Sequence, residues 1–167
     1  MRKRIAFIFA LPAMLLAVVL FAQAAQADSP HFLFADNSVS TSTGALTTSF
    51  KDAGLGTGTT SIAVTLTADG TAVYQCFNNG GNHPKAGNKE TVSGPLSATG
   101  NFPVRNGQVT ASLTVGPPGP GDFACPSGQT LFLQEATYSN TFVSDATGNT
   151  AHATPDPIST GPIHVAV

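Results

Sequence analysis

Histidine, serine and carboxylate side chains are the groups of this 167-residue chain that could transfer protons or hold a metal ion. The four histidines are His31, His83, His152 and His164, and no two of them have the short spacing of a metal site. No serine stands in a Gly-x-Ser-x-Gly frame, since Ser127 lies in Pro-Ser-Gly-Gln. A catalytic triad could form only from residues that the fold brings together. The sequence itself therefore predicts no catalytic residue, no metal site and no cofactor.

Four of the nine carboxylates stand in sequences that favour turns, where Asp hydrogen-bonds to nearby backbone. These sequences are Asp36-Asn37, Asp52-Ala53-Gly54, Asp69-Gly70 and Gly121-Asp122. Glu90 and Glu135 lie in strand-like runs, and we expect both to face water. A carboxylate pair for glycoside hydrolysis is therefore not expected. Because no Asp-x-Asp-x-Asp run occurs, a calcium loop is not expected either.

The first 27 residues have the three parts of a secretory signal peptide. Basic residues occupy positions 2–4, and an apolar run follows at 5–22. Ala25 and Ala27 then provide the small residues of a cleavage site. A transmembrane anchor is the alternative, but the run is at the short limit for a span. We predict cleavage after Ala27, secretion of residues 28–167, and no membrane span after cleavage.

After cleavage, the exported part would contain four basic residues and all nine acidic residues. So few cations argue against binding to nucleic acid or to anionic membrane surfaces. Proteins that bind carbohydrate usually show exposed aromatic rings that pack against the sugar. This chain has no Trp and two Tyr, and we expect most of its Phe side chains to lie in the core. Carbohydrate binding therefore has no support from the sequence.

The two cysteines, Cys76 and Cys125, lie in the part predicted to be exported, where an isolated pair usually forms a disulfide. The bridge would bring two loops to one end of the molecule, the Asn-rich loop 78–88 and the Pro-rich loop 116–128. Loops on a rigid scaffold often carry recognition, although a plain solvated connection is the alternative. The candidate binding residues are Asn78, Asn79, Asn82, His83, Lys85, Asn88 and Lys89.

The exported part has the period of β-strands. Apolar residues alternate with Thr or Ala at 62–67 and with Thr or Ser at 109–115, which indicates one buried and one solvated face. No stretch of 28–167 has helical spacing of apolar residues over ten positions. Besides these two runs, strands are predicted at 31–35, 45–51, 130–139 and 163–167.

Three turn sequences predict hairpins. Asp69-Gly70 would join 59–68 to 71–77, Asn106-Gly107 would join 96–104 to 108–115, and Thr147-Gly148-Asn149 would join 141–146 to 150–153. The predicted fold is an all-β antiparallel β-sandwich of about eight or nine strands with one disulfide. The predicted domains are the signal peptide at 1–27 and a single sandwich domain at 28–167.

Such a sandwich resembles the immunoglobulin-like superfold in the broad sense. Tyr74 precedes Cys76 by two positions, as in the tyrosine corner of immunoglobulin domains. In those domains, however, this spacing occurs at the second cysteine, whereas here it occurs at the first. The chain also has no Trp, and Cys125 stands in a predicted loop. The resemblance therefore implies an Ig-like sandwich and not a true immunoglobulin domain.

A closer resemblance covers roughly residues 61–144. The segments YQCFNNGGNHPKAGNKETVSGPLSATGNFPVRNGQVTASLTV and ACPSGQTLFLQEATYSN are similar to small exported proteins of actinobacteria, which are uncharacterised. The resemblance implies export and an actinobacterial source, and it implies no activity.

We therefore expect a secreted, non-enzymatic module of the extracellular space or cell envelope that binds through the loops near the disulfide. Its partner, unknown from the sequence, would be an extracellular protein or a cell-wall component. One alternative is an exported hydrolase with a dispersed active site. Another is a surface structural protein that assembles through an exposed strand edge, since a Thr- and Ser-rich sheet with few charges is weakly protected against edge pairing.

Overall fold

The computed structural model describes residues 29–78 and 88–167, and in these ranges the chain forms nine strands. The strands are β1 (His31–Val39), β2 (Leu46–Ala53), β3 (Ser61–Asn78), β4 (Lys89–Pro103), β5 (Gln108–Val115), β6 (Gln129–Asp145), β7 (Thr150–His152), β8 (Ile158–Ser159) and β9 (Val165–Ala166). All pairs between them are antiparallel. The predicted all-β antiparallel fold is confirmed. The predicted signal peptide and its cleavage site lie outside the described residues.

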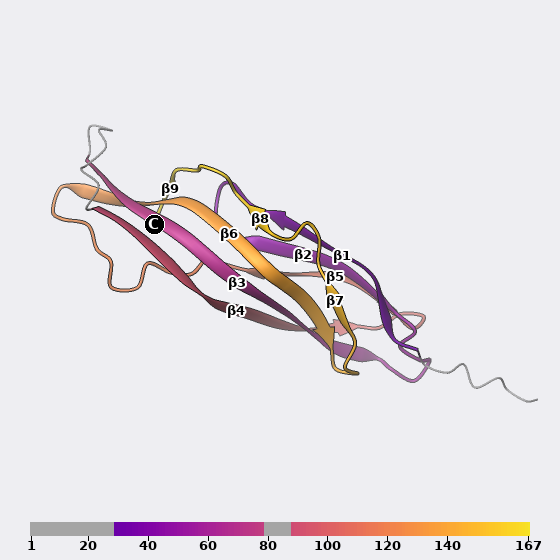
Figure 1. Cartoon of the computed structure of the whole chain (residues 1–167). Coiled ribbons are helices and arrows are strands. Elements are labelled where there is room, and N and C mark those ends of the chain that lie inside the picture. Colours follow the sequence, from indigo (N-terminus) through magenta and orange to yellow (C-terminus); the bar gives the residue numbers. More distant parts are fainter. Residues whose placement is uncertain (1–28, 79–87) are drawn as a thin grey trace, which may run out of the picture.

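The strands form two sheets (Figure 1). The smaller sheet has the order β1-β2-β5, and the larger sheet has the order β4-β3-β6-β7, with β8 and β9 also paired to β6. Strands β3 and β6 have 18 and 17 residues, whereas β2 and β5 have 8 each. The smaller sheet is therefore too short to cover the whole larger sheet.

The main core lies between the two sheets, because the apolar residues of each alternating strand face inward. Phe50 of β2 is fully buried and makes edge-to-face ring contacts with Phe32 and Phe102, at centroid distances of 5.9 Å and 5.5 Å. The Tyr138 hydroxyl of β6 donates a 2.6 Å hydrogen bond to the Gly44 carbonyl, in the loop between β1 and β2. This bond ties the larger sheet to the smaller one.

A second, smaller core lies where the larger sheet extends past the smaller one. Ala72, Tyr74 and Leu133 are buried there, and Phe123 of the loop between β5 and β6 packs against them. The Tyr74 hydroxyl donates a 2.7 Å hydrogen bond to the carbonyl of Pro118 in the same loop. The Pro-rich loop therefore covers this part of the larger sheet.

The hairpin predicted at Asp69-Gly70 is wrong, because β3 runs through both residues without a turn. Gly70 pairs with Gly94 of β4 on one side and with Tyr138 of β6 on the other. A Cβ atom at Gly70 would lie 2.6 Å from Leu96 Cδ1 and 2.9 Å from Pro118 Cδ. The glycine is thus required by the close approach of the Pro-rich loop, a common reason for glycine within a strand.

The turn predicted at Asn106-Gly107 is present, but the strands on either side of it belong to different sheets. Both residues have positive φ, at 51° and 69°, and Arg105 and Gln108 exchange backbone hydrogen bonds of 2.9 Å and 3.0 Å. Strand β4 then pairs with β3, while β5 pairs with β2. The predicted pairing is therefore wrong, and the turn carries the chain from one sheet to the other.

The hairpin at Thr147-Gly148-Asn149 is confirmed, since Ser144 of β6 pairs with Thr150 of β7. The two strands predicted at 130–139 and 141–146 are one strand, β6, with a bulge at Asn140. The strands predicted near both ends of the domain are present as β1, β2 and β9, and β9 pairs with β6.

Candidate functional site

The predicted disulfide between Cys76 and Cys125 is confirmed, with Cα atoms 5.6 Å apart. Cys76 is fully buried near the end of β3. The bridge therefore attaches the Pro-rich loop to the larger sheet beside Asn78, where β3 ends, and Lys89, where β4 begins. The Asn-rich loop begins and the Pro-rich loop ends at this end of the molecule, as we predicted from the sequence (Figure 1).

Three of the seven candidate binding residues are described, namely Asn78, Asn88 and Lys89. The Asn88 side-chain amide donates a 2.9 Å hydrogen bond to Oε1 of Gln129, the first residue of β6. Gln129 also pairs with Asn78 across β3 and β6, and Lys89 is exposed. Gln129 therefore links the two strand ends that flank the Asn-rich loop. The other candidates, Asn79, Asn82, His83 and Lys85, lie outside the described residues.

An aromatic cluster lies beside these residues. The His164 ring stacks on Phe132 of β6 at a centroid distance of 3.8 Å, and it meets Phe77 of β3 edge-on at 4.6 Å. Gln134 Nε2 donates a 3.0 Å hydrogen bond to His164 Nδ1. Phe132 pairs with Gln75 of β3, and Cys76 is the next residue of β3. Because neighbouring residues along a strand point to opposite faces, Phe132 lies on the face of the sheet opposite the Cys76 side chain. His164 is exposed, so the cluster can contact a partner.

We call this region the disulfide end. It comprises the described residues Asn78, Asn88, Lys89, Gln129, Phe77, Phe132 and His164, together with the loop 116–128. Sequence reasoning missed the aromatic cluster. The alternation in β6 could have indicated Phe132, which stands between the inward-facing Leu131 and Leu133. His164 had no such signal, because it reaches the site from a distant part of the chain.

The three described histidines lie on different elements. His31 Nδ1 is 2.7 Å from the carbonyl oxygen of Ser29, and His152 Nε2 is 2.6 Å from Asp156 Oδ2. His164 belongs to the aromatic cluster described above. Within residues 29–78 and 88–167, no three His, Cys, Asp or Glu side chains gather in a way that could hold a metal ion.

Two carboxyl groups lie buried at the opposite end of the molecule. We predicted from the sequence that Asp52 lies in a turn, but it lies in β2 and its side chain is fully buried. Burial, and then the negative charge of Asp145, raise the pKa of Asp52 to about 7.

Asp145 shows the opposite change. Burial alone would raise the pKa of Asp145, but hydrogen bonds from Thr147 and Asn149 lower it below its ordinary value. The Asp145 carboxylate accepts bonds of 2.6–3.0 Å from the backbone and side chains of these two residues. One carboxyl group therefore favours its protonated form and the other its ionised form. A substrate could reach Asp52 only if the core opened.

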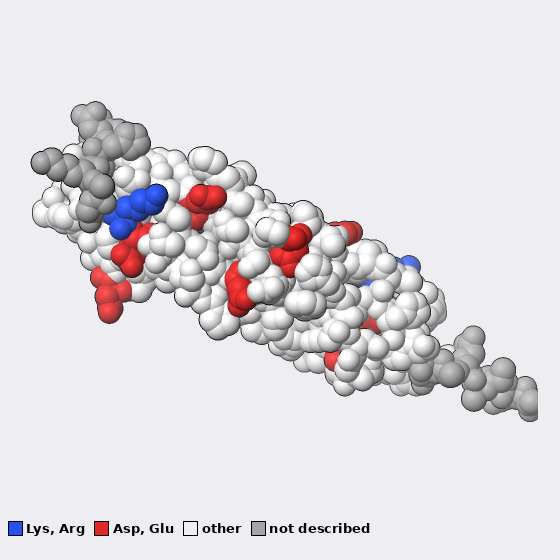
Figure 2. Space-filling view, in the orientation of Figure 1, with Lys and Arg blue, Asp and Glu red and all other residues white. Residues whose placement is uncertain are grey.

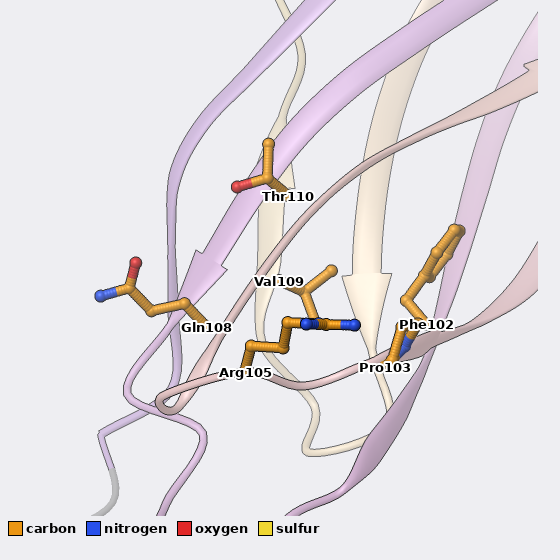
Figure 3. Close-up of a pocket in the computed structure, with 6 residues that line it drawn as sticks. All are labelled: Phe102, Pro103, Arg105, Gln108, Val109 and Thr110. Carbon is orange, nitrogen blue, oxygen red and sulfur yellow. The ribbon is translucent and has the colours of Figure 1, made fainter.

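A cavity of about 350 Å³ lies at the same end, where β4 and β5 diverge toward their different sheets. Its lining residues are Phe102, Pro103, Arg105, Gln108, Val109 and Thr110. The Arg105 side chain extends past Val109 toward Phe102 and Pro103 (Figure 3). Val109 is buried and pairs with Asp52 across β5 and β2. The cavity thus offers one cation beside an apolar wall, and its volume is near the lower limit for a small-molecule site.

Comparisons with protein-family models, curated proteins and solved structures found no match to this chain. In the part of the chain that the structure describes, no helix is long and apolar enough to cross a bilayer.

Proposed function

We propose that this protein is a secreted, non-enzymatic binding module of the extracellular space or cell envelope, and that it binds its partner through the disulfide end. The partner would be an extracellular protein or a cell-wall component. The observation that carries this proposal is the convergence of separate chain segments on one disulfide. The bridge and the Asn88–Gln129 hydrogen bond hold the ends of β3 and β4, the loop 116–128 and the start of β6 together.

This arrangement suits recognition because its parts are ordered before a partner arrives. Ordering loops and side chains on binding costs free energy, so a surface held in place in advance binds more tightly. The chemistry also suits a protein interface, which combines aromatic contacts with a polar rim. Here Phe132 and His164 supply the rings, while Asn88 and Lys89 supply hydrogen-bond donors.

The proposal of export has two supports. The N-terminal sequence has the pattern of a signal peptide ending at Ala27. The Cys76–Cys125 bridge is the second support, because disulfides persist mainly in oxidising compartments outside the cytoplasm. The alternative of an exported hydrolase has weaker support, since the carboxyl pair with opposite pKa shifts is buried.

The test uses residues 28–167 in oxidised form, immobilised and exposed to intact cells and culture supernatant of the source organism. Cross-linking and mass spectrometry would identify the retained component. We expect Lys89→Ala combined with His164→Ala to reduce retention at least about tenfold, the effect of losing contacts at the centre of an interface.

Lys51→Ala is the matched control, because Lys51 is also a strand lysine but lies on the smaller sheet. This control should retain the component fully. If it loses retention as strongly as the double variant, or if the double variant binds like the unchanged protein, the disulfide end is not the binding site.

A further inference from the structure

A shallow depression of about 440 Å³ lies on the outer face of the larger sheet, away from the disulfide end. It spans β4, β3 and β6, and the residues that matter here are Thr67, Asp69, Pro95, Ser97, Asn140 and Phe142. Its volume is within the range of small-molecule sites in proteins. The depression is open, so it can hold one unit of a long ligand that continues on both sides.

A β-bulge forms the floor of the depression. Thr67 pairs with Phe142 and Asp69 with Ser139, so Ala68 of β3 faces two residues of β6, Asn140 and Thr141. Asn140 takes up the extra length with a φ of 52°. Bulges of this kind redirect a side chain and are common beside functional sites. Here the redirected Asn140 amide donates a 2.8 Å hydrogen bond to Asp69 Oδ2.

Phe142 forms one wall of the depression, and 41% of its surface is exposed. It stands in a row of directly paired residues that crosses four strands, from Ser97 through Thr67 and Phe142 to His152. The His152 ring supports it from β7 at a centroid distance of 4.9 Å, and His152 is itself held by Asp156. The aromatic ring is therefore fixed in place before a ligand arrives.

The chemistry of the lining selects the class of ligand. Phe142 and Pro95 offer apolar surface, Thr67 and Ser97 offer hydroxyl groups, and the Asp69–Asn140 pair offers hydrogen-bond acceptors and donors. Asp69 is the one charged residue among the described residues that line the depression, and its carboxylate would repel an anionic ligand. Figure 2 shows that the surrounding surface is mostly uncharged, with scattered carboxylates.

We infer that this depression binds a sugar unit of a neutral polysaccharide. A sugar ring has an apolar face of C–H groups that can pack on Phe142, as apolar groups pack on aromatic faces generally. Its hydroxyl groups can bond to the Asp69 carboxylate, and bonds to an ionised acceptor are stronger than bonds between neutral groups. This site is separate from the disulfide end and does not depend on the function proposed there.

The test is affinity electrophoresis of the oxidised protein in native gels that contain hydroxyethylcellulose, xylan or galactomannan. Matched gels contain the anionic polysaccharides alginate or polygalacturonate. We expect retardation in at least one neutral gel and none in the anionic gels. Phe142→Ala should weaken the interaction at least about tenfold, whereas Phe142→Trp should keep or strengthen it, since it enlarges the aromatic surface.

Phe34→Ala is the matched control, because Phe34 is 37% exposed but lies on β1 of the smaller sheet. It should leave retardation unchanged, as should the Lys89 and His164 variants of the disulfide end. Circular dichroism would check that each variant is folded. Absence of retardation in all neutral gels, stronger retardation in the anionic gels, or equal loss with Phe34→Ala would each overturn the inference.

Discussion

Asp52 and Asp145 are two buried carboxyl groups that influence each other, yet their pKa values move in opposite directions. The difference comes from their hydrogen bonds. Asp145 accepts several bonds from Thr147 and Asn149 in the hairpin after β6, whereas the contributions that lower the pKa of Asp52 are smaller than those of burial and of the nearby Asp145. Burial then determines the outcome for Asp52, which carries a proton in the folded protein up to near-neutral pH.

We predict that the protein loses stability as the pH rises from about 4 to about 7, between the unfolded pKa of Asp and the folded pKa of Asp52. In this range the unfolded chain releases the Asp52 proton while the folded protein keeps it. Above the pKa of Asp52 in the folded protein, the decrease in the free energy of unfolding is complete, and it amounts to about 4 kcal/mol at most.

Urea denaturation between these pH values measures the effect. Asp52→Asn should remove most of the decrease, because the amide cannot ionise. The pKa of Asp145 is lower in the folded protein than in the unfolded chain. Its contribution to the free energy of unfolding is therefore lost only at more acidic pH, as the pH falls through the folded pKa of Asp145. An unchanged pH dependence in Asp52→Asn would show that another group causes it.

Gly70 and Gly94 are paired directly across β3 and β4, but their surroundings differ. A Cβ at Gly70 would collide with Leu96 and Pro118, whereas a Cβ at Gly94 would meet no atom of residues 29–78 or 88–167 within 4 Å. We predict that Gly70→Ala lowers the free energy of unfolding by about 1–3 kcal/mol, the usual cost of overpacking. Gly94→Ala is the control and should have an effect near zero. Equal effects in chemical denaturation would contradict this packing.

At the scale of the elements, the alternation of apolar and polar residues predicted most strands correctly, because the buried face of a strand must be apolar. The same local rules could not show that β3 passes through Asp69-Gly70. That outcome depends on Pro118 of a loop almost fifty residues later in the sequence, which approaches Gly70. The local rules also could not show that β4 and β5, which a regular Asn-Gly turn connects, belong to different sheets.

Strand β4 is a long edge of the larger sheet, and its prolines give it protection against pairing with other chains. Pro95 and Pro103 lie eight residues apart, so both have the same orientation in the strand. Proline occurs in sheets where its nitrogen faces outward, and there it removes a hydrogen-bond donor that an incoming strand would need.

We therefore predict that the protein stays monomeric at low and high concentration in sedimentation experiments. Replacing both edge prolines, Pro95→Thr with Pro103→Thr, should cause association that increases with concentration. Pro120→Thr, in the loop between β5 and β6, is the control and should remain monomeric. Assembly of the unchanged protein would instead support the alternative of a self-assembling surface protein.

At the scale of the whole molecule, we expect the two cores to differ in their local stability against unfolding. The main core joins the two sheets, whereas the second core depends on the loop that Cys125 attaches to β3. Replacing both Cys76 and Cys125 by Ser should cost about 2–5 kcal/mol, the usual effect of losing a disulfide in a small secreted domain.

Hydrogen exchange would show where the double replacement acts. The amides of Tyr74 and Leu133 in the second core should exchange faster, while those of Leu46 and Phe50 in the main core should change little, because local opening follows local contacts. Uniform acceleration across both cores would show that the bridge stabilises the fold as one unit.

The candidate sites were predictable to different degrees. The cysteine pair indicated that the two loops meet at one end, because a disulfide fixes distances between remote residues. The depression around Phe142 was not predictable. The sequence indicated a break between strands at Asn140, but it could not show that this position is a bulge within the single strand β6. The sequence suggested that Phe side chains would lie mostly in the core, and Phe142 departs from this expectation.

The long axis of the molecule also determines how it would bear force. Strand β1 begins beside the end of β2, where His31 pairs with Ala53 and Ser29 lies against Gly54. At the other end of the molecule (Figure 1), β9 pairs with β6, and its Val165 packs against the second core. A pull between the two ends of the domain therefore acts along the strands. Hydrogen bonds between antiparallel strands are perpendicular to the strands. Such a load shears many of these bonds at once instead of opening them one at a time, so the fold is suited to resist stretching along its length.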